Sequence, residues 1–205
     1  MYKTGRQRYE GGGGSIFYPS EIEIKHDLKN LQGDSYRNEN SGAGNIFKVI
    51  LRKALMCDVK PLYVLFSEYF KAGEMLPRSM SDIYEHLRDF YIAEIENYDE
   101  TGSNNIIGAC ALTIVWENLA EIRSLAVKGP YTKKLIGTEL VKKCIEEARF
   151  FQITGILALT YKPQFFNKLG FSVIDKSELP HKIWSDCLNC VKFPDCDETA
   201  VMLKL

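Results

Sequence analysis

The residues of this sequence that could do chemistry gather around a loop at 128–138. Lys133 and Lys134 lie in this loop, just before apolar residues begin to recur at helical spacing from Ile136. The first N–H groups of a helix have no partner within the helix, and they lie at the positive end of its dipole. The loop and the first helical turn therefore predict an anion site, for which a phosphate-bearing cofactor is the natural ligand.

A strand must lead into this loop. Residues 119–127 favour a strand that carries polar side chains and ends in an apolar tripeptide, and Gly129-Pro130 ends it. Glu121 and Arg123 are two residues apart, so on a strand their side chains share a face. The order strand, loop, helix thus places a carboxylate and a guanidinium upstream of the anion site.

The composition is that of a globular protein. A chain of 205 residues, 45% of them hydrophobic, fits one domain of ordinary size with an appendage. The formal net charge of −1 gives no reason to expect a nucleic-acid or membrane partner. Apolar runs are too short to span a membrane, and residues 1–9 lack the apolar centre of a secretory signal. We therefore expect a cytoplasmic protein whose six cysteines are mostly reduced.

The first 44 residues differ in composition from residues 45–205. They contain the run Gly11-Gly-Gly-Gly-Ser15 and a polar stretch at 34–44, which predict a flexible N-terminal arm. Within the arm, Glu21 to Lys25 alternates like a short strand, so a strand or clamp used in a homo-oligomer is the alternative.

The pattern of residues 45–205 predicts a strand, two helices, three strands, a helix, a strand, a short helix and two strands. Asp58 is the expected N-cap of the first helix, and Ser79 or Ser81 of the second. The expected strands lie at 47–53, 90–95, 106–116, 119–127, 155–160, 171–175 and 199–203, and the expected helices at 58–72, 79–88, 136–151 and 163–170.

This order and two motifs resemble the GNAT superfamily of N-acyltransferases over about residues 46–205. In that family a strand ending in Leu-Ala-Val is followed by Pro, an aromatic residue and a loop of the form Gln/Arg-x-x-Gly-x-Gly/Ala. Thr132-Lys-Lys-Leu-Ile-Gly137 has this spacing, and Phe165-Phe-Asn-Lys-Leu-Gly-Phe171 is similar to the family's Phe-Tyr-x-Lys-Leu-Gly-Phe. The resemblance implies an α/β (α+β) fold: a mixed, mostly antiparallel sheet splayed at its central strands, with helices on both faces.

The resemblance also implies acetyl-CoA as co-substrate. Its pantetheine and thioester would lie along Leu125, Ala126 and Val127. Backbone N–H groups would hold its pyrophosphate, at Lys133, Lys134, Leu135, Ile136, Gly137 and Thr138. Thr132 stands where the family has Gln or Arg, and Leu135 where it has the first Gly. Leu135 keeps the N–H donor but makes a positive φ costly and crowds the phosphates, so we expect weakened binding.

For catalysis, the resemblance implies a base and an acid. The family often places a carboxylate four residues before Leu125, so Glu121 is the candidate base, acting through water, and an ion pair with Arg123 is the alternative. The usual acid is a Tyr before x-Lys-Leu-Gly-Phe, where this chain has Phe166, which cannot donate a proton. Tyr161 or water would substitute, and a structural role is the alternative for Tyr161.

A narrower resemblance concerns the substrate. Met75-Leu-Pro-Arg-Ser79, Leu119–Arg123 and Asp175–Trp184 are similar to the short, kinase-less amino-acid N-acetyltransferases that resemble N-acetylglutamate synthase. This implies direct transfer, in a ternary complex, to the α-amino group of a free amino acid, glutamate first, in arginine biosynthesis. Arg78 is the expected ligand of the amino acid's carboxylate, with Arg123 and Lys182 as second choices.

Two other functions stay open at this point. One is acetylation of a protein N-terminus or a polyamine, which would need an open or acidic groove. The other is a non-catalytic acyl-CoA-binding sensor, which the departures at Thr132, Leu135 and Phe166 favour.

The C-terminal tail contains a spacing that metal sites use. Cys187-x2-Cys190 is followed by Cys196, and with His181 these residues could form a Cys3His site. A single Cys-x2-Cys pair is weak evidence, so free thiols or a disulfide are favoured over a structural metal. Small core residues are expected at the other cysteines, Cys57, Cys110 and Cys144.

Overall fold

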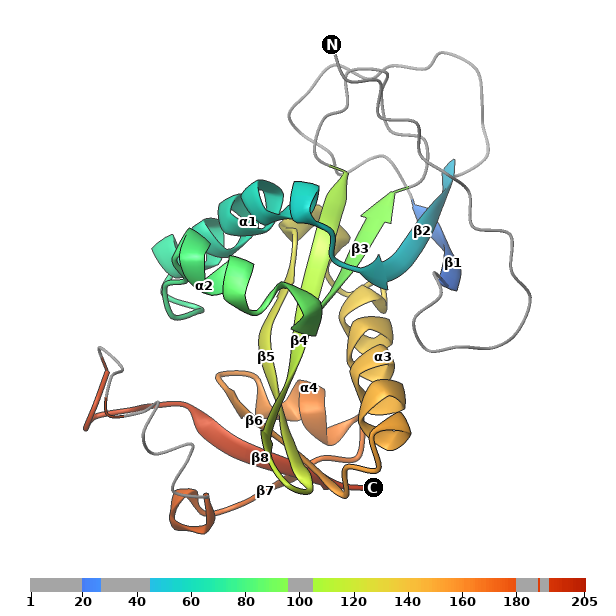
Figure 1. The fold of residues 1–205 in the computed structure, drawn as a ribbon. Helices are drawn as coiled ribbons and strands as arrows, with labels where there is room; N and C mark the ends of the chain where they lie inside the picture. Colours follow the sequence, from blue (N-terminus) through green and yellow to red (C-terminus); the bar gives the residue numbers. More distant parts are fainter. Residues whose placement is uncertain (1–19, 27–44, 96–104, 180–187, 189–191) are drawn as a thin grey trace.

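One mixed sheet with helices on both faces organises this computed structural model, which describes residues 20–26, 45–95, 105–179, 188 and 192–205 (Figure 1). Among these residues the strand order is β1-β2-β3-β4-β5-β6-β8-β7, and all neighbours are antiparallel except β5 and β6. The strands are β1 (Ser20–His26), β2 (Asn45–Lys53), β3 (Phe90–Ile95), β4 (Ile106–Trp116), β5 (Leu119–Val127), β6 (Gly155–Thr160), β7 (Ser172–Val173) and β8 (Thr199–Lys204). The helices are α1 (Val59–Lys71), α2 (Met80–Glu85), α3 (Ile136–Phe150) and α4 (Pro163–Asn167).

The sheet has two apolar faces because successive side chains of a strand point to opposite sides. In β3, Phe90 and Ile92 belong to the core under α1 and α2, whereas Tyr91 and Ala93 belong to the core under α3. Figure 1 shows α1 and α2 on one side of the sheet and α3 on the other. From β2 onward the order of elements is the predicted one, and the fold implied by the resemblance is confirmed.

Strand β1 lies at one edge of the sheet. It pairs with β2 along its length, from Ser20 opposite Leu51 to His26 opposite Asn45. The alternation from Glu21 to Lys25 predicts this strand. Residues 20–26 thus form the strand that was the alternative to a flexible arm. The rest of the segment 1–44 lies outside the described residues.

The two predicted helix caps differ in outcome. Ser79 caps α2, because its hydroxyl accepts a hydrogen bond from the N–H of Asp82 at 3.1 Å. The side chain of Asp58 makes no cap hydrogen bond to α1. Its carboxylate instead accepts two hydrogen bonds from Arg52 on β2, at 2.7 and 3.1 Å. The predicted capping role of Asp58 is therefore wrong, because an ion pair takes its place.

Two of the three cysteines expected in the core are there. Cys110 on β4 and Cys144 on α3 are buried, with their Sγ atoms 3.5 Å apart. Burial raises the pKa of the Cys144 thiol, and its hydrogen bond to Cys110 adds to this effect. The prediction for Cys57 is wrong, because this residue is exposed in the short turn between β2 and α1.

The two central strands separate along their length. β5 and β6 pair in parallel only as far as Glu121 opposite Leu157, although β5 continues to Val127 and β6 to Thr160. Beyond Glu121 the strands diverge, which opens the sheet at its middle. Glu121 thus lies at the apex of the opening.

A β-bulge distorts β5 just beyond this apex. Ala109 and Ala111 of β4 face Ala126 and Arg123 of β5, so three steps along β5 match two along β4. Ser124, inside the bulge, has a φ of 53°, in the left-handed region that residues other than glycine rarely adopt.

Helix α3 packs directly onto β4 at Gly108. A Cβ atom there would lie 3.2 Å from Leu140 Cδ1 and 3.3 Å from Ile136 Cγ2. The missing side chain therefore lets the first turns of α3 approach the sheet and brings the start of the helix to the end of β5.

Candidate active site

A cleft of about 1290 Å³ lies where β5 and β6 separate. Its walls come from the end of α1 and the loop to α2, the second half of β5, the loop into α3, and the segment from β6 into α4. Residues just before β8 line it as well. The volume exceeds the roughly 300–1,000 Å³ of a pocket for one small ligand, so two ligands can occupy it together.

Most residues predicted to bind ligands line this cleft: Arg78, Glu121, Arg123, Leu125, Val127, Lys133, Leu135, Gly137, Thr138 and Cys196. The side chains of Ala126 and Ile136 are instead buried in the core, so only their backbone groups could reach a cofactor. Lys134 is not among the lining residues. Lys182, His181, Cys187 and Cys190 lie outside the described part of the chain.

The start of α3 presents backbone donors beside the end of β5. The first α-helical hydrogen bond runs from the N–H of Glu139 to the carbonyl of Leu135 at 2.9 Å, so the N–H groups of residues 136–138 precede it. Leu135 has a φ of 64°, and its side chain is 68% exposed. The backbone thus takes the conformation that suits glycine. With Lys133 beside it, this helix start fits the pyrophosphate of acetyl-CoA.

Replacing Leu135 by Gly should tighten acetyl-CoA binding by roughly 2- to 10-fold, because the phosphates could approach the loop more closely. The left-handed φ also favours glycine, so the variant should fold at least as well as the wild type. Isothermal titration of acetyl-CoA measures the first effect.

Gly137→Ala is the matched control, with the opposite sign. A Cβ atom there would lie 3.6 Å from Phe165 Cζ and 3.7 Å from Val127 Cγ2, which are ordinary contacts, so the fold should tolerate it. Because Gly137 lines the cleft, the added methyl group should crowd the expected pyrophosphate and weaken binding. Equal affinities for both variants and the wild type would contradict the placement of the pyrophosphate.

Tyr69 fixes the end of β5, and sequence reasoning missed this. Its hydroxyl donates a hydrogen bond to the carbonyl of Val127 and accepts one from the N–H of Val127 at 3.2 Å. Tyr69 lies on the face of α1 that packs on the apolar core with Leu62, Leu65 and Phe66. A hydroxyl within an otherwise apolar helix face was the available signal, because a buried Tyr O–H usually needs a partner.

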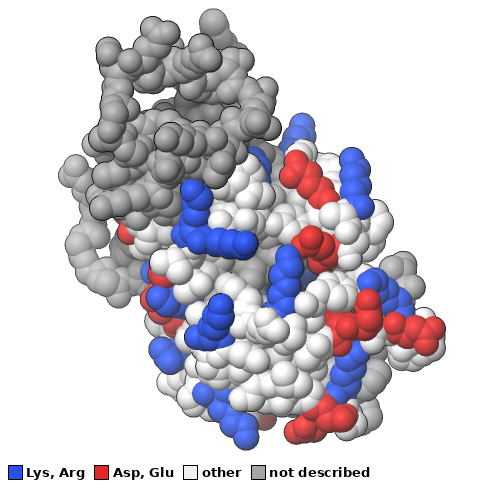
Figure 2. All heavy atoms as spheres, turned by 180° about the vertical axis from the view of Figure 1, so that it is seen from behind, with Lys and Arg blue, Asp and Glu red and all other residues white. Residues whose placement is uncertain are grey.

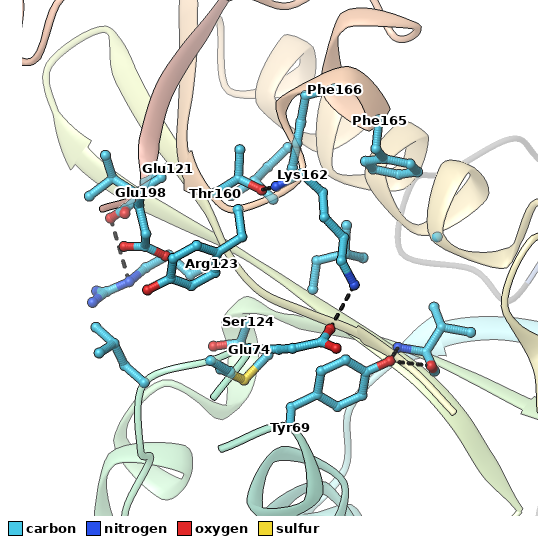
Figure 3. Close-up of a pocket in the computed structure, with 18 of the residues that line it drawn as sticks. Tyr69, Glu74, Glu121, Arg123, Ser124, Thr160, Lys162, Phe165, Phe166 and Glu198 are labelled. Carbon is cyan, nitrogen blue, oxygen red and sulfur yellow. Dashed lines mark hydrogen bonds and ion pairs between the residues drawn. The ribbon is translucent and has the colours of Figure 1, made fainter. Parts of the chain in front are cut away.

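Glu121, Arg123 and Glu198 gather at one end of the cleft (Figure 3). Arg123 Nε lies 3.5 Å from Glu121 Oε2, so the predicted ion pair is present. The carboxylate of Glu121 is nevertheless part of the cleft wall, where it can accept a proton from a bound amine or water. Burial raises the pKa of Glu198, and the charge of Lys192 opposes that rise.

Arg78 enters the same cleft from the loop before α2. Its side chain is only 12% exposed. Its Nε donates a hydrogen bond to Ser124 Oγ at 2.6 Å, and its Nη1 pairs with Asp82 one helical turn on. Arg78 is therefore a guanidinium held in place, in contrast to a solvated surface arginine.

The position where the family has its acid holds Phe166, which cannot donate a proton, and Tyr161 or water is the expected substitute. Phe166 is buried between Phe165 and Phe171, with ring centroids 5.2 Å apart in both pairs. Tyr161 lines the cleft, but its hydroxyl donates to Asp197 at 3.1 Å and accepts from the ammonium of Lys192. Burial raises the pKa of Tyr161, with the Lys192 hydrogen bond opposing, so the hydroxyl keeps its proton at neutral pH.

An ion pair crosses the cleft. Lys162, just before α4, reaches to Glu74 in the loop after α1, with 2.6 Å between Nζ and Oε2 (Figure 3). The two side chains are 66% and 46% exposed, so the pair contributes little to stability.

On the face seen in Figure 2, positive and negative side chains are interspersed. Within the described residues, no helix has both the length and the apolar character needed to cross a bilayer.

Cys196 is the predicted metal ligand that the structure describes. Its thiol is free and partly buried in the cleft wall, with Sγ 4.0 Å from Glu198 Oε2. Its backbone carbonyl accepts a hydrogen bond from Lys176 at 2.7 Å. Among the described residues, no three His, Cys, Asp or Glu side chains come together in a way that could hold a metal ion.

The sheet opens at its two central strands, with a helix start beside the opening and a carboxylate at its apex, which is the arrangement that the resemblance to the N-acyltransferases implies. A family model described as the acetyltransferase (GNAT) family matches residues 59–171. An uncharacterized N-acetyltransferase from Chlorobaculum tepidum is 36% identical over 155 residues, which cover 76% of this chain and 96% of that protein. The chain belongs to the acetyltransferase (GNAT) family. It is an N-acetyltransferase with acetyl-CoA as its acetyl donor.

Two further relatives have more specific names. The amino-acid acetyltransferase of Mycobacterium tuberculosis is 29% identical over 138 residues, which cover 67% of this chain and 76% of that protein. N-acetylglutamate synthase from Neisseria gonorrhoeae, solved in complex with coenzyme A and N-acetyl-glutamate, superimposes with a TM-score of 0.67 at 25% identity. That match covers 80% of this chain but 36% of the gonococcal chain, so this chain corresponds to the smaller part of it.

Proposed function

We propose that this protein transfers the acetyl group of acetyl-CoA to the α-amino group of a free amino acid, glutamate first, and that it serves arginine biosynthesis. Arg78 is the observation that carries the proposal. A guanidinium held by Ser124 and Asp82 in the cleft is suited to binding a carboxylate beside the acetyl donor. The similarity to an amino-acid acetyltransferase and to an N-acetylglutamate synthase supports the choice of substrate.

The roles of the other cleft residues follow from their places. Acetyl-CoA supplies an activated acetyl group as a thioester. The backbone at Leu125 and Val127 would run beside its pantetheine, and the start of α3 would hold its pyrophosphate. Glu121 would take the proton that the ammonium group must lose before it can attack, directly or through water. Because the cleft has room for both ligands, transfer would occur directly in a ternary complex.

Arg78→Ala should raise the KM for glutamate by about 10- to 100-fold, the equivalent of losing hydrogen bonds to a charged group. The KM for acetyl-CoA should change little, because the hydrogen bonds of Arg78 go to Ser124 on β5 and Asp82 on α2. Thiol release from acetyl-CoA, with glutamate, glutamine, aspartate and a polyamine as acceptors, measures both values.

Arg88→Ala is the matched control, because Arg88 is an exposed arginine of the same region that does not line the cleft. It should behave as the wild type. Turnover with a polyamine or a peptide N-terminus, but with no free amino acid, would replace the proposal by one of those two substrates.

A second candidate is a non-catalytic acyl-CoA sensor. It is favoured by the two positions where a proton donor was sought, because neither offers a free hydroxyl. Phe166 cannot donate, and the Tyr161 hydroxyl is held by Asp197 and Lys192. A thermal shift with acetyl-CoA, together with no thiol release for any acceptor, would support this sensor.

A further inference from the structure

We propose that Ser124 is the positioning residue that sets the place of Arg78 in the acceptor site. The inference rests on the proposed function, because it treats Arg78 as the ligand of the acceptor's carboxylate. Three observations support it: the hydrogen bond from Arg78 to Ser124, the left-handed backbone of Ser124, and the position of Ser124 directly before Leu125.

The hydrogen bond leaves the guanidinium little freedom. Arg78 Nε donates to Ser124 Oγ at 2.6 Å, and Nη1 pairs with Asp82. Within the described residues, these contacts engage two of the three guanidinium nitrogens and leave Nη2 for a ligand. A long side chain that is 12% exposed and fixed at two nitrogens can present the third in a defined direction. The hydroxyl of Ser124 therefore decides where the carboxylate of an acceptor would bind.

The backbone at Ser124 is arranged to place this hydroxyl. Ser124 has a φ of 53° inside the bulge of β5, a conformation that is costly for a residue with a side chain. Such conformations persist where the surrounding structure enforces them, and they concentrate at functional sites. Glycine would remove this cost but would have no hydroxyl to offer to Arg78.

The position of Ser124 in the chain links Arg78 to the backbone that is expected to hold the acetyl donor. Ser124 directly precedes Leu125, beside which the pantetheine and thioester are expected to lie. Arg78 is thus fastened to the same short stretch of backbone that would hold the acetyl donor. The distance between the acceptor's carboxylate and the thioester is then set by one rigid bulge, which is the kind of fixed geometry that transfer between two bound ligands needs.

Two substitutions separate the hydroxyl from the backbone conformation. Ser124→Ala and Ser124→Gly both remove the hydrogen bond to Arg78, but only glycine also relieves the left-handed φ. If Ser124 positions Arg78, both variants are impaired. If the hydroxyl has no positioning role, both variants keep the KM of the wild type, because alanine meets the same backbone cost as serine and glycine meets less. Ser124→Gly also keeps the test valid if the alanine variant folds poorly.

Both variants should raise the KM for glutamate by about 5- to 20-fold, less than Arg78→Ala, because the guanidinium is displaced but not lost. We expect kcat and the KM for acetyl-CoA to stay within about twofold of the wild type, since the acetyl-binding backbone is kept. Thiol release at varied glutamate and varied acetyl-CoA gives all three values.

A double-mutant cycle is the decisive control. In an Arg78→Ala background, Ser124→Gly should have no further effect on the KM for glutamate, because its target is gone. The positioning role would be overturned if Ser124→Gly raised the KM for glutamate equally with and without Arg78, or left this KM at the wild-type value. Either result would leave the proposed function intact. No turnover of any amino acid by the wild type would overturn both.

Discussion

Glu121→Gln should lower kcat by about 10²- to 10⁴-fold, the usual contribution of a general base, while folding and acetyl-CoA binding remain those of the wild type. Glu121 lies at the apex of the opening between β5 and β6 and lines the cleft, although it is only 6% exposed. Glutamine has the same shape and keeps an oxygen for Arg123, so the substitution removes chiefly the ability to accept a proton.

The pH dependence tells this role apart from a structural ion pair. A neutral amine needs no base, so the deficit of Glu121→Gln should shrink as the pH rises toward the pKa of the substrate's amino group. The matched control is Arg123→Gln, which breaks the same ion pair but keeps the carboxylate, and which should retain most of kcat. A purely structural Glu121 would instead give a pH-independent deficit, and both variants would lose thermal stability alike.

Arg52→Met should destabilise the protein by about 3–5 kcal/mol, the cost of breaking a buried ion pair from one side. Arg52 Nη1 lies 2.7 Å from Asp58 Oδ2, and Nη2 lies 2.8 Å from Glu94 Oε2. Burial alone would lower the pKa of Arg52, but the hydrogen bonds to both carboxylates outweigh it and raise the pKa, so Arg52 stays charged. Without the guanidinium, two carboxylates that are 5% and 8% exposed would be left without their cation.

Urea denaturation followed by circular dichroism measures this loss as a lower midpoint with an unchanged m-value. Neutralising all three residues, in Arg52→Met/Asp58→Asn/Glu94→Gln, should recover most of the stability because no buried charge is left alone. Lys142→Met is the surface control: it breaks the pair with Glu139, whose side chains are 54% and 27% exposed, and should cost at most about 0.5 kcal/mol. A loss below about 1 kcal/mol in Arg52→Met would contradict the network's importance.

The sequence predicts the elements well because each has a strong local pattern. Helix α3 shows a clear apolar face, and β5 ends at Gly129-Pro130 almost where the pattern places its end. The shared face of Glu121 and Arg123 follows from the two-residue period of a strand, and the structure confirms their contact. The strand, loop and helix around residues 128–138 also follow one another in the predicted order.

What the sequence does not predict depends on contacts between distant residues. Arg52 and Glu94 are 42 positions apart, and Arg78 and Ser124 are 46 apart, so no local pattern relates them. The role expected of Asp58 fails for a more local reason: the guanidinium of Arg52, six residues earlier on β2, pairs with the carboxylate that would otherwise cap the helix. The bulge at Ser124 depends on how β4 and β5 pair, which is fixed only in the assembled sheet.

The strand order of the second half-sheet has a consequence for how the protein is made. Strand β8 pairs with both β6 and β7, and so lies between two strands that precede it in the chain. Strands β2 to β5 can pair with their neighbours as they leave the ribosome, because each follows the last in both sequence and space. The part of the sheet beyond β6 can form only after residues 199–204 have been synthesised, because β7 joins the sheet through β8. The end of the cleft that Glu198 lines, just before β8, is therefore the last to form, after the loop and helix start at 128–138 have been made.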